Sequence, residues 1–185
     1  KAALLTGMGD DKVADFLLRF LNDEGVETKL IPRIPGTRTS AVVLGIEPPD
    51  RFPLVYYREN CADNAMTIDH VLAANVSQFR CLEISGTALS KEPCRSAAFF
   101  AVEEAVRASV PVMLDLDFRQ DQWHDARAFG VTTRALLPRV NVAIGTEEEV
   151  LATMLTDPNQ ITVQHQQMSA PEIRGNLDDA IAGIL

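Results

Sequence analysis

The chain has 185 residues, 46% of them hydrophobic and 23% charged, and its formal net charge at pH 7 is -9. This length and composition predict one domain with a sizeable core, and no polar or low-complexity block points to a disordered tail. The acidic balance argues against nucleic-acid binding, which requires a surface rich in lysine and arginine. No apolar run reaches the roughly 18 residues needed to span a bilayer, and residues 1–5 do not resemble a signal peptide. We therefore expect neither a nucleic acid nor a membrane as a partner.

The cysteines indicate the compartment. Cys61, Cys81 and Cys94 are odd in number and have neither a CxxC nor a Cys/His ligand spacing. This pattern fits a reducing compartment better than a disulfide framework, so we expect a cytoplasmic protein in which each thiol is buried and inert. The histidines are far apart and predict neither a zinc site nor a hydrolase triad.

The first third of the chain predicts a strand, a helix and a pair of strands. Apolar runs, helical spacing of apolar residues and clusters of Gly, Pro and Asp mark these elements in turn. The expected order is a buried strand over 1–6, a turn at 7–11, a helix over 13–21 that stops at Gly25, and a hairpin of residues 39–47 and 53–58 joined by a turn at 48–51.

From residue 63 onward, predicted strands and helices alternate. Strands separated by helical stretches imply right-handed crossovers and a mainly parallel, doubly wound sheet with helices on both faces. Ligands of such sheets bind beyond the carboxyl ends of the strands. We expect strands at 81–85, 110–115 and 140–144, helices at 90–108, 126–137, 147–155 and 178–185, and an unassigned polar segment at 159–167.

The strongest local feature follows one of these strands. Leu114-Asp115-Leu116-Asp117-Phe118-Arg119 places two carboxylates and an arginine at a strand's carboxyl end, with Trp123 four residues beyond the arginine. These groups could order a cation, orient a sugar hydroxyl or hold a phosphate. Alternatively, Asp115 or Asp117 caps the next helix and Arg119 pairs with them at the surface.

Two further clusters carry polar groups. Tyr56 and Arg58 end a predicted strand two positions apart and share a face, so they could grip a sugar acid; cross-strand packing beside a solvated arginine is the alternative. Gly145-Thr146-Glu147-Glu148-Glu149 opens a helix after a strand, where backbone N–H groups favour anions, although the glutamates also fit plain dipole complementarity. The turn at 7–11 is neither a Walker loop nor a Rossmann fingerprint.

Taken in order, these motifs identify a family resemblance. Asp10-Asp11 before a helix, Arg38-Thr39, Tyr56-Tyr57-Arg58, the 115–119 segment with Trp123, and Glu149 resemble the order found in ribokinase-like (phosphofructokinase-B) carbohydrate kinases. The resemblance extends over about residues 1–150 and is poor from residue 156 onward. It implies a doubly wound α/β domain that carries a small β lid and transfers a phosphoryl group from ATP with Mg²⁺.

Within that family, one branch fits best. Residues 44–54, residues 85–90 and the second aspartate of Asp115-Leu116-Asp117 resemble the kinases that convert 5-dehydro-2-deoxy-D-gluconate to its 6-phosphate in myo-inositol catabolism. Kinases of 2-keto-3-deoxygluconate, which usually have Asn in place of Asp117, and other sugar kinases are the alternative. The resemblance also implies a core of residues 1–37 and 63–185, a β lid of residues 38–62, and a homodimer formed through the lid.

The resemblance assigns expected roles residue by residue. Arg38, Tyr56, Arg58 and Asp117 would bind the sugar acid, and Arg119 would be the catalytic residue that neutralises charge near the substrate or the transferring phosphoryl group. Thr146 and Glu149 fall on the family's Asn-x-x-Glu motif, which organises magnesium and phosphates through water and supplies no direct metal ligand. Here Thr146 stands in place of the Asn.

Two family segments are absent from the 185 residues. Neither the upstream Gly-Gly sugar-binding segment nor the downstream Gly-Ala-Gly-Asp segment with its catalytic base occurs. The chain is therefore expected to be a central fragment that is inactive alone, because general-base assistance has no evident residue. The competing hypotheses are a non-catalytic sugar-acid-binding module on the same fold and a purely structural domain.

Overall fold

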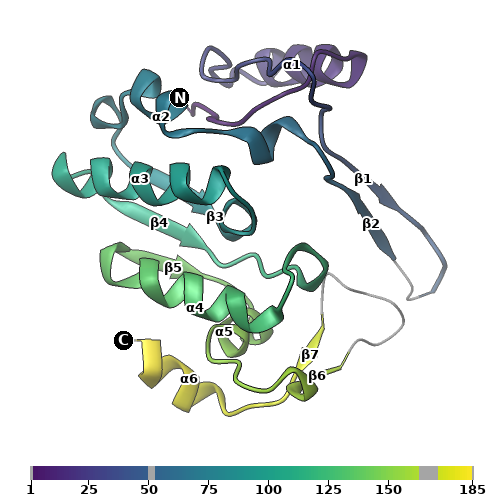
Figure 1. The fold of residues 1–185 in the computed structure, drawn as a ribbon, viewed down its shortest axis with the longest axis vertical. Helices are drawn as coiled ribbons and strands as arrows, with labels where there is room; N and C mark the ends of the chain where they lie inside the picture. The colour runs from purple at the N-terminus through teal and green to yellow at the C-terminus, as the bar shows by residue number, and fades with distance from the viewer. Residues whose placement is uncertain (1, 50–52, 163–170, 185) are drawn as a thin grey trace.

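A computed structural model describes residues 2–49, 53–162 and 171–184 (Figure 1). The chain is built on a three-stranded parallel sheet with the order β3 (Leu82–Ser85), β4 (Val112–Asp115) and β5 (Val142–Ile144). Helices α3 (Cys94–Arg107) and α4 (Ala126–Leu136) connect these strands, as parallel neighbours require. Both helices lie on the side of the sheet that faces the viewer in Figure 1. The predicted α/β fold with a parallel sheet is confirmed.

The remaining elements surround this sheet. None of the helices in the described ranges is long and apolar enough to cross a membrane.

Helix α3 begins at Cys94 rather than at residue 90, because Pro93 precedes it and a 3-10 turn occupies Gly86–Leu89. The other helices are α1 (Lys12–Asp23), α2 (Ile68–Ala74), α5 (Glu147–Thr153) and α6 (Leu177–Ile184), and the other 3-10 turns are Ala62–Ala65, Val76–Gln78, Gln120–Gln122, Leu137–Arg139 and Pro158–Gln160.

The main core lies between the sheet and the crossover helices. Val112 and Leu114 of β4 are fully buried against α3 and α4, which contribute Val102, Phe129 and other apolar residues. The Phe129 ring packs against Phe118 at 4.8 Å and against Trp123, edge to face, at 5.6 Å between centroids. Burial of each such side chain stabilises the fold by about 1.5 to 3 kcal/mol. The chain that leaves β4 is therefore firmly held.

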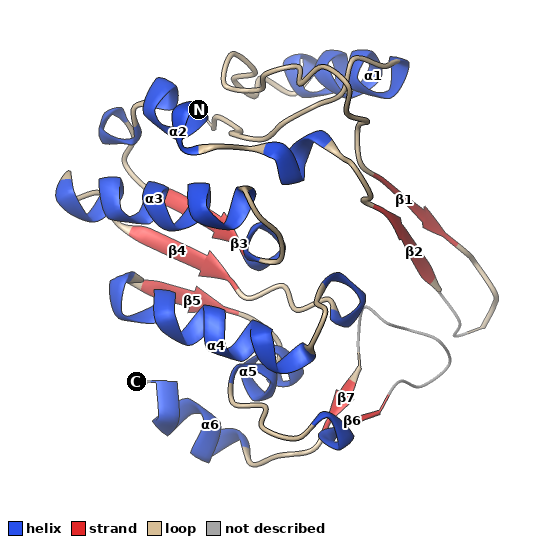
Figure 2. Ribbon diagram, in the orientation of Figure 1, coloured by secondary structure: helices blue, strands red, loops and turns tan. Residues whose placement is uncertain are grey.

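Two small antiparallel sheets complete the fold (Figure 2). Strands β1 (Ala41–Leu44) and β2 (Leu54–Tyr57) form the predicted hairpin, with Ala41 opposite Tyr57 and Leu44 opposite Leu54. It lies inside the range 38–62, although the division into core and lid remains a prediction. Strands β6 (Ile161–Thr162) and β7 (Glu172–Ile173) were not predicted. Part of the unassigned segment, residues 163–167, lies outside the described residues.

The beginning of the chain departs from the prediction of a buried strand over 1–6. Residue 1 lies outside the described residues, Ala3 forms only an isolated parallel bridge with Glu27, and Leu4 is 40% exposed. The bonds are Leu4 N–H to Glu27 O at 3.3 Å and Glu27 N–H to Ala2 O at 2.9 Å. An isolated bridge does not form a ladder, so residues 2–6 are not a strand.

The cysteines only partly follow the expectation of buried thiols. Cys61 and Cys94 are buried, and burial raises the pKa of the Cys94 thiol to about 11. Cys81 is exposed, so the prediction is wrong there. It lies one residue before β3, outside the buried part of the sheet.

Asp11 ties the start of α1 to the base of the hairpin. As the N-cap, its Oδ1 accepts from the Ala14 N–H at 2.9 Å and from the Thr39 hydroxyl at 2.9 Å, while Oδ2 accepts from the Thr39 N–H at 2.8 Å. The Thr39 backbone bond is the main cause that lowers the pKa of Asp11. One carboxylate therefore stabilises both the helix and the entry to β1.

We predict that Asp11→Ala lowers the free energy of unfolding at pH 7 by about 1 to 2 kcal/mol, the usual effect of a lost N-cap. Because the pKa of Asp11 is lowered on folding, its contribution is present above its unfolded pKa of about 4 and is lost as the pH falls through the folded pKa. Urea unfolding across pH 7 to 3 should show a smaller pH-dependent loss in Asp11→Ala than in wild type.

The matched control is Asp10→Ala, because the Asp10 side chain is 85% exposed and lies 3.8 Å from Arg33. This variant should unfold like wild type at every pH. An equal loss of stability in both variants would contradict the role of Asp11.

Candidate functional site

Burial alternates strictly along the segment that runs through and beyond β4. Leu114, Leu116 and Phe118 are at most 1% exposed, whereas Asp115, Asp117 and Arg119 between them are half-buried. The Leu116 N–H still donates to Ile144 O of β5 at 2.8 Å. Within β4 the alternation of a strand holds Asp115 away from the core, and beyond it the burial of Leu116 and Phe118 leaves Asp117 and Arg119 on the outer side. Neither aspartate caps a helix, since Asp125 caps α4.

Asp117 links three elements at this edge of the sheet. Its Oδ1 lies 2.6 Å from Arg119 Nη2, and its Oδ2 accepts from the Ser85 hydroxyl of β3 at 3.0 Å. Arg119 Nη1 in turn lies 3.6 Å from Glu149 Oε1 of α5. Asp117 adopts a positive φ of 40°, which costs a non-glycine residue on the order of 1 kcal/mol or more. These contacts hold the carboxylate in place despite that strain.

The loop after β3 approaches the loop after β4 very closely. A Cβ on Gly86 would lie 1.9 Å from Leu116 O. Only glycine permits this approach. Next to it, the Thr87 hydroxyl lies 2.8 Å from the Ser85 hydroxyl, which in turn donates to Asp117.

The hairpin supplies the opposite wall. Arg58, directly after β2, donates from Nε to Asp63 Oδ2 at 2.8 Å, from Nη2 to the same oxygen and to Asn64 Oδ1, and from Nη1 to Gln122 Oε1. The Arg58 and Asp63 side chains are only 14% and 16% exposed. The Arg58–Gln122 bond joins the hairpin to the loop that follows β4.

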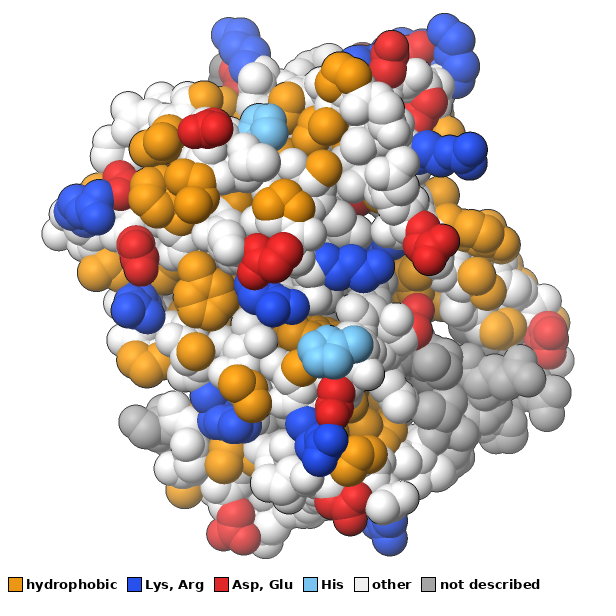
Figure 3. All heavy atoms as spheres, viewed as in Figure 1, with side chains coloured by type: hydrophobic (Ala, Val, Ile, Leu, Met, Phe, Trp, Pro, Cys, Tyr) orange, Lys and Arg blue, Asp and Glu red, His pale blue; other side chains and the backbone are white. Residues whose placement is uncertain are grey.

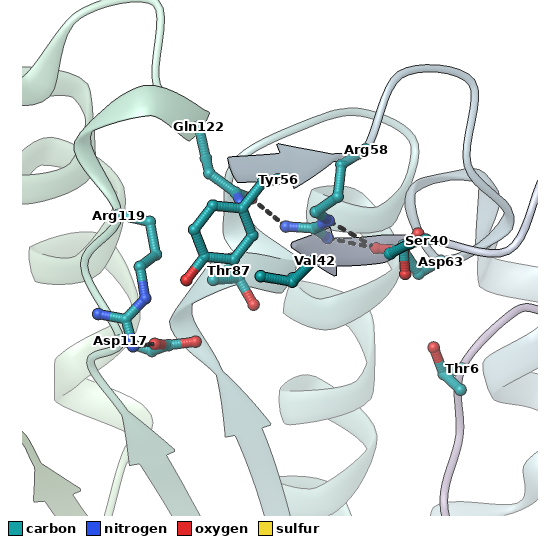
Figure 4. A pocket seen from close by; sticks show the side chains of 11 residues that line it. Thr6, Ser40, Val42, Tyr56, Arg58, Asp63, Thr87, Asp117, Arg119 and Gln122 are labelled. Atoms are coloured by element: carbon teal, nitrogen blue, oxygen red, sulfur yellow. Dashed lines mark hydrogen bonds and ion pairs between the residues drawn. The ribbon is translucent and has the colours of Figure 1, made fainter. Parts of the chain in front are cut away.

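Between these walls lies a cavity of about 340 Å³, large enough for a small ligand (Figure 4). Tyr56 and Arg58 enter it from the hairpin, and Asp117 and Arg119 enter it from the end of β4. Four of the seven predicted site residues therefore converge. The full lining is Thr6, Ser40, Ala41, Val42, Tyr56, Arg58, Asp63, Thr87, Asp117, Arg119 and Gln122.

Three predicted site residues lie outside the lining. Arg38 is exposed, and its backbone pairs with Asn60 and Ala62 at the base of the hairpin. Thr146 and Glu149 form a capping box at the start of α5, as the Thr146 N–H donates to Glu149 Oε2 at 2.9 Å and the Glu149 N–H to Thr146 Oγ1 at 3.3 Å. Among the described residues of the lining, Glu149 pairs with Arg119.

Burial raises the pKa of two acidic residues at this edge of the sheet. It is the first cause that raises the pKa of Glu149, against the lowering effects of the Thr146 N–H and Arg119. Burial likewise raises the pKa of Asp115, with Asp117 and Glu83 adding like charge. Within the described ranges, no group of three or more His, Cys, Asp or Glu is arranged to hold a metal ion.

Sequence reasoning missed five polar residues of the lining and Ser85, which bonds to Asp117; the five are Thr6, Ser40, Asp63, Thr87 and Gln122. Ser85-Gly86-Thr87 directly follows a predicted strand, and this position was a usable signal. Asp63 and Gln122 had no comparable signal, because their importance depends on Arg58, which is distant from Gln122 in the sequence.

We predict that Gly86→Ala destabilises the protein by about 1 to 3 kcal/mol or more, because the new Cβ must push against backbone at Leu116. Gly175→Ala is the matched control, since its Cβ would meet only the flexible end of Leu151 at 2.8 Å. Thermal unfolding of both variants measures the difference. An equal shift in melting temperature would show that the close approach at Gly86 is not required.

The fold is that of an α/β protein with a cavity at the carboxyl ends of parallel strands, beside a β hairpin, which is where ligands of such sheets usually bind. The chain belongs to the pfkB family of carbohydrate kinases, whose profile, described as "pfkB family carbohydrate kinase", matches residues 1–173. The predicted family resemblance is therefore confirmed.

Two curated relatives show which members of the family the chain is similar to. The 5-dehydro-2-deoxygluconokinase of Geobacillus thermodenitrificans (strain NG80-2) is 32% identical over 150 residues, which cover 80% of this chain and 44% of the relative. The enzyme of the same name from Clostridium tetani (strain Massachusetts / E88) is 29% identical over 150 residues, with the same shares of 80% and 44%. The chain thus spans less than half the length of these relatives.

Solved structures agree on the fold. The PfkB protein from Polaromonas sp. JS666 superposes with a TM-score of 0.77 at 20% identity, covering 86% of this chain and 54% of that one. The fructokinase from Vibrio cholerae O395 in its fructose, ADP and calcium ion bound form gives a TM-score of 0.75 at 21% identity, covering 100% and 54%. At this identity the likeness establishes the shared fold alone.

Proposed function

We propose that this chain forms the acceptor-binding part of an ATP- and Mg²⁺-dependent kinase that phosphorylates 5-dehydro-2-deoxy-D-gluconate. The observation that carries the proposal is the convergence of Tyr56 and Arg58 with Asp117 and Arg119 on one cavity. The relatives named 5-dehydro-2-deoxygluconokinase support the choice of acceptor. A reducing compartment such as the cytoplasm is part of the proposal, supported by the free thiols of Cys61, Cys81 and Cys94.

In this proposal the residues act by position and charge. The Tyr56 phenol bonds an acceptor hydroxyl, and Arg119 neutralises negative charge that builds up between acceptor and phosphoryl donor. Asp117 orients Arg119 through the 2.6 Å contact, and Glu149 supports it from the other side at 3.6 Å. Phosphoryl transfer depends mainly on such positioning and electrostatic stabilisation.

The acidic groups fit a hydrated cation better than a direct metal cage. Magnesium usually keeps several waters and takes one or two protein carboxylates together with substrate phosphates. Glu149, with Thr146 at the start of α5, would hold such an ion through water. ATP with Mg²⁺ would supply the phosphoryl group.

The charge balance of the cavity favours a second candidate, a neutral ketose. Arg58 pairs with Asp63, and Arg119 pairs with Asp117, so the charges of the lining residues cancel formally. A cavity without net positive charge does not require an anionic acceptor. A neutral sugar such as fructose must therefore be compared directly with the sugar acids.

We predict that wild type binds 5-dehydro-2-deoxygluconate more tightly than 2-keto-3-deoxygluconate or fructose. Arg119→Ala should weaken sugar-acid binding by about 1.5 to 3 kcal/mol, the range for hydrogen bonds to charged groups, and fructose binding by less. The fluorescence of Trp123, the only tryptophan in the chain, reports binding. ADP release with Mg²⁺-ATP is expected to be absent with every acceptor, because general-base assistance has no evident residue among these 185 residues.

The control for this series is Arg127→Ala, because Arg127 pairs with Asp125 at 2.5 Å at the start of α4 and does not line the cavity. It should bind every acceptor like wild type. Tighter binding of fructose, with equal effects of Arg119→Ala on both acceptors, would replace the sugar-acid assignment by the neutral-ketose candidate.

We also propose a homodimer through the hairpin, supported by its exposed apolar face. Val42 and Tyr56 line the cavity, whereas Val43, Val55 and Tyr57 point the other way and are 54%, 51% and 59% exposed. Hydrophobic side chains gather over this hairpin at the right of Figure 3. Unpaired strand edges and an apolar face are features that commonly pair with a second sheet.

We predict that Val43→Glu raises the dimer dissociation constant about 10-fold or more, because it places an unpaired carboxylate in the interface. Val13→Glu on α1, where Val13 is 47% exposed, is the control. Sedimentation velocity over a range of protein concentrations measures both. A dimer that tolerates Val43→Glu but not Val13→Glu would move the interface to α1.

A further inference from the structure

Two side-chain atoms of cavity-lining residues are buried and have no hydrogen-bond partner within the part of the chain that the structure describes. They are Asp63 Oδ1 and Gln122 Nε2, and both residues line the cavity. Buried polar atoms of folded proteins are nearly always bonded to protein or to water. An acceptor and a donor left over in one cavity wall therefore point to an external polar group that completes them.

The orientation of Gln122 is fixed by its neighbour. Arg58 Nη1 donates to Gln122 Oε1, and a guanidinium has no acceptor, so the amide must turn its oxygen to Arg58 and its Nε2 elsewhere. Gln122 is 8% exposed, and Trp123 after it packs against Phe129. The amide is thus held by its own side-chain bond and by the core behind it.

Asp63 is held by the same arginine. Arg58 Nε and Nη2 both bond to Asp63 Oδ2, which leaves Oδ1 unused. Figure 4 shows Arg58 between Gln122 and Asp63 on the hairpin side of the cavity. One guanidinium therefore positions a spare N–H donor on one side and a spare carboxylate oxygen on the other.

We propose that Gln122 and Asp63 are specificity-determining residues that recognise the hydroxyl groups of the acceptor. Gln122 Nε2 donates to an acceptor oxygen, Asp63 Oδ1 accepts from an acceptor hydroxyl, and Arg58 is the positioning residue that holds both. This inference rests on the proposed function, since a polyhydroxylated chain offers both kinds of group. A site with buried polar groups made for hydroxyls strongly rejects an analogue that lacks one, because those groups are left unpaired.

The decisive variant is Gln122→Glu. It keeps an oxygen for Arg58 Nη1 but replaces the Nε2 donor by an acceptor of the same shape. We expect it to weaken binding of 5-dehydro-2-deoxygluconate about 10- to 100-fold, as measured by Trp123 fluorescence. The new carboxylate also repels an anionic acceptor, so the proposal requires a loss that depends on the acceptor's hydroxyl groups. An equal loss for every analogue would mean that Gln122 only joins the hairpin to the core, and that result overturns the proposal.

A set of acceptor analogues, each lacking one hydroxyl, separates a sugar hydroxyl from a bound water, which has the same donor and acceptor capacity. Wild type should discriminate against one analogue, and Gln122→Glu should lose that discrimination. Asp63→Asn, which turns the Oδ1 acceptor into a donor, should lose discrimination against another. An equal drop for all analogues in both variants would assign the two atoms to water and overturn the proposal.

The experiments distinguish failure of the proposed function from failure of this inference. If wild type binds no sugar acid and no fructose, the proposed function falls and this inference with it. If wild type binds 5-dehydro-2-deoxygluconate and folded Gln122→Glu binds it equally well, only the inference falls. Circular dichroism and thermal unfolding establish that each variant is folded, and Arg127→Ala again serves as the unchanged control.

Discussion

The alternating burial of the chain through and beyond β4 is the constraint on which the site depends. Leu114, Leu116 and Phe118 are buried in the core, so the side chains of the residues between them must lie on the side away from it. Asp117 and Arg119 consequently line the cavity without help from a ligand. The positive φ of Asp117 can persist because its flanking residues are buried on both sides. Core packing thus positions the chemistry.

The hairpin is joined to this rigid part by polar contacts. At its base Asp11 bonds to Thr39 and Arg58 bonds to Gln122, while most of its apolar side chains remain exposed. Hydrogen bonds are directional, whereas apolar burial is not. The contacts therefore fix where Tyr56 and Arg58 lie relative to Arg119 while contributing little buried area. The distance between the hairpin and the end of β4 therefore depends on a few hydrogen bonds, and polar groups of a ligand can add to them.

The sequence predicted the parallel sheet, the hairpin and four cavity residues because each carries a local signal. Tyr56 and Arg58 have strand spacing, and Asp117 and Arg119 follow an apolar run. Gln122 and Asp63 could not be found this way, since their role arises from contact with Arg58 across the fold. The prediction of a buried strand over 1–6 was wrong for a related reason. An apolar run predicts such a strand, but burial also needs neighbours on both sides, and among the described residues Ala3 pairs with Glu27 alone.

The paired charges of the cavity determine how it can select a ligand. An anionic acceptor must share Arg58 with Asp63 and Arg119 with Asp117, so part of the attraction is already used within the protein. Net charge then discriminates weakly between acid and neutral sugar. Discrimination falls to hydrogen-bond geometry, in which a missing or misplaced hydroxyl leaves a buried donor or acceptor unpaired. In the proposed function, a neutral but densely polar cavity is suited to recognising the pattern of hydroxyl groups along a sugar chain, and Arg119 would act on charge that appears only during phosphoryl transfer.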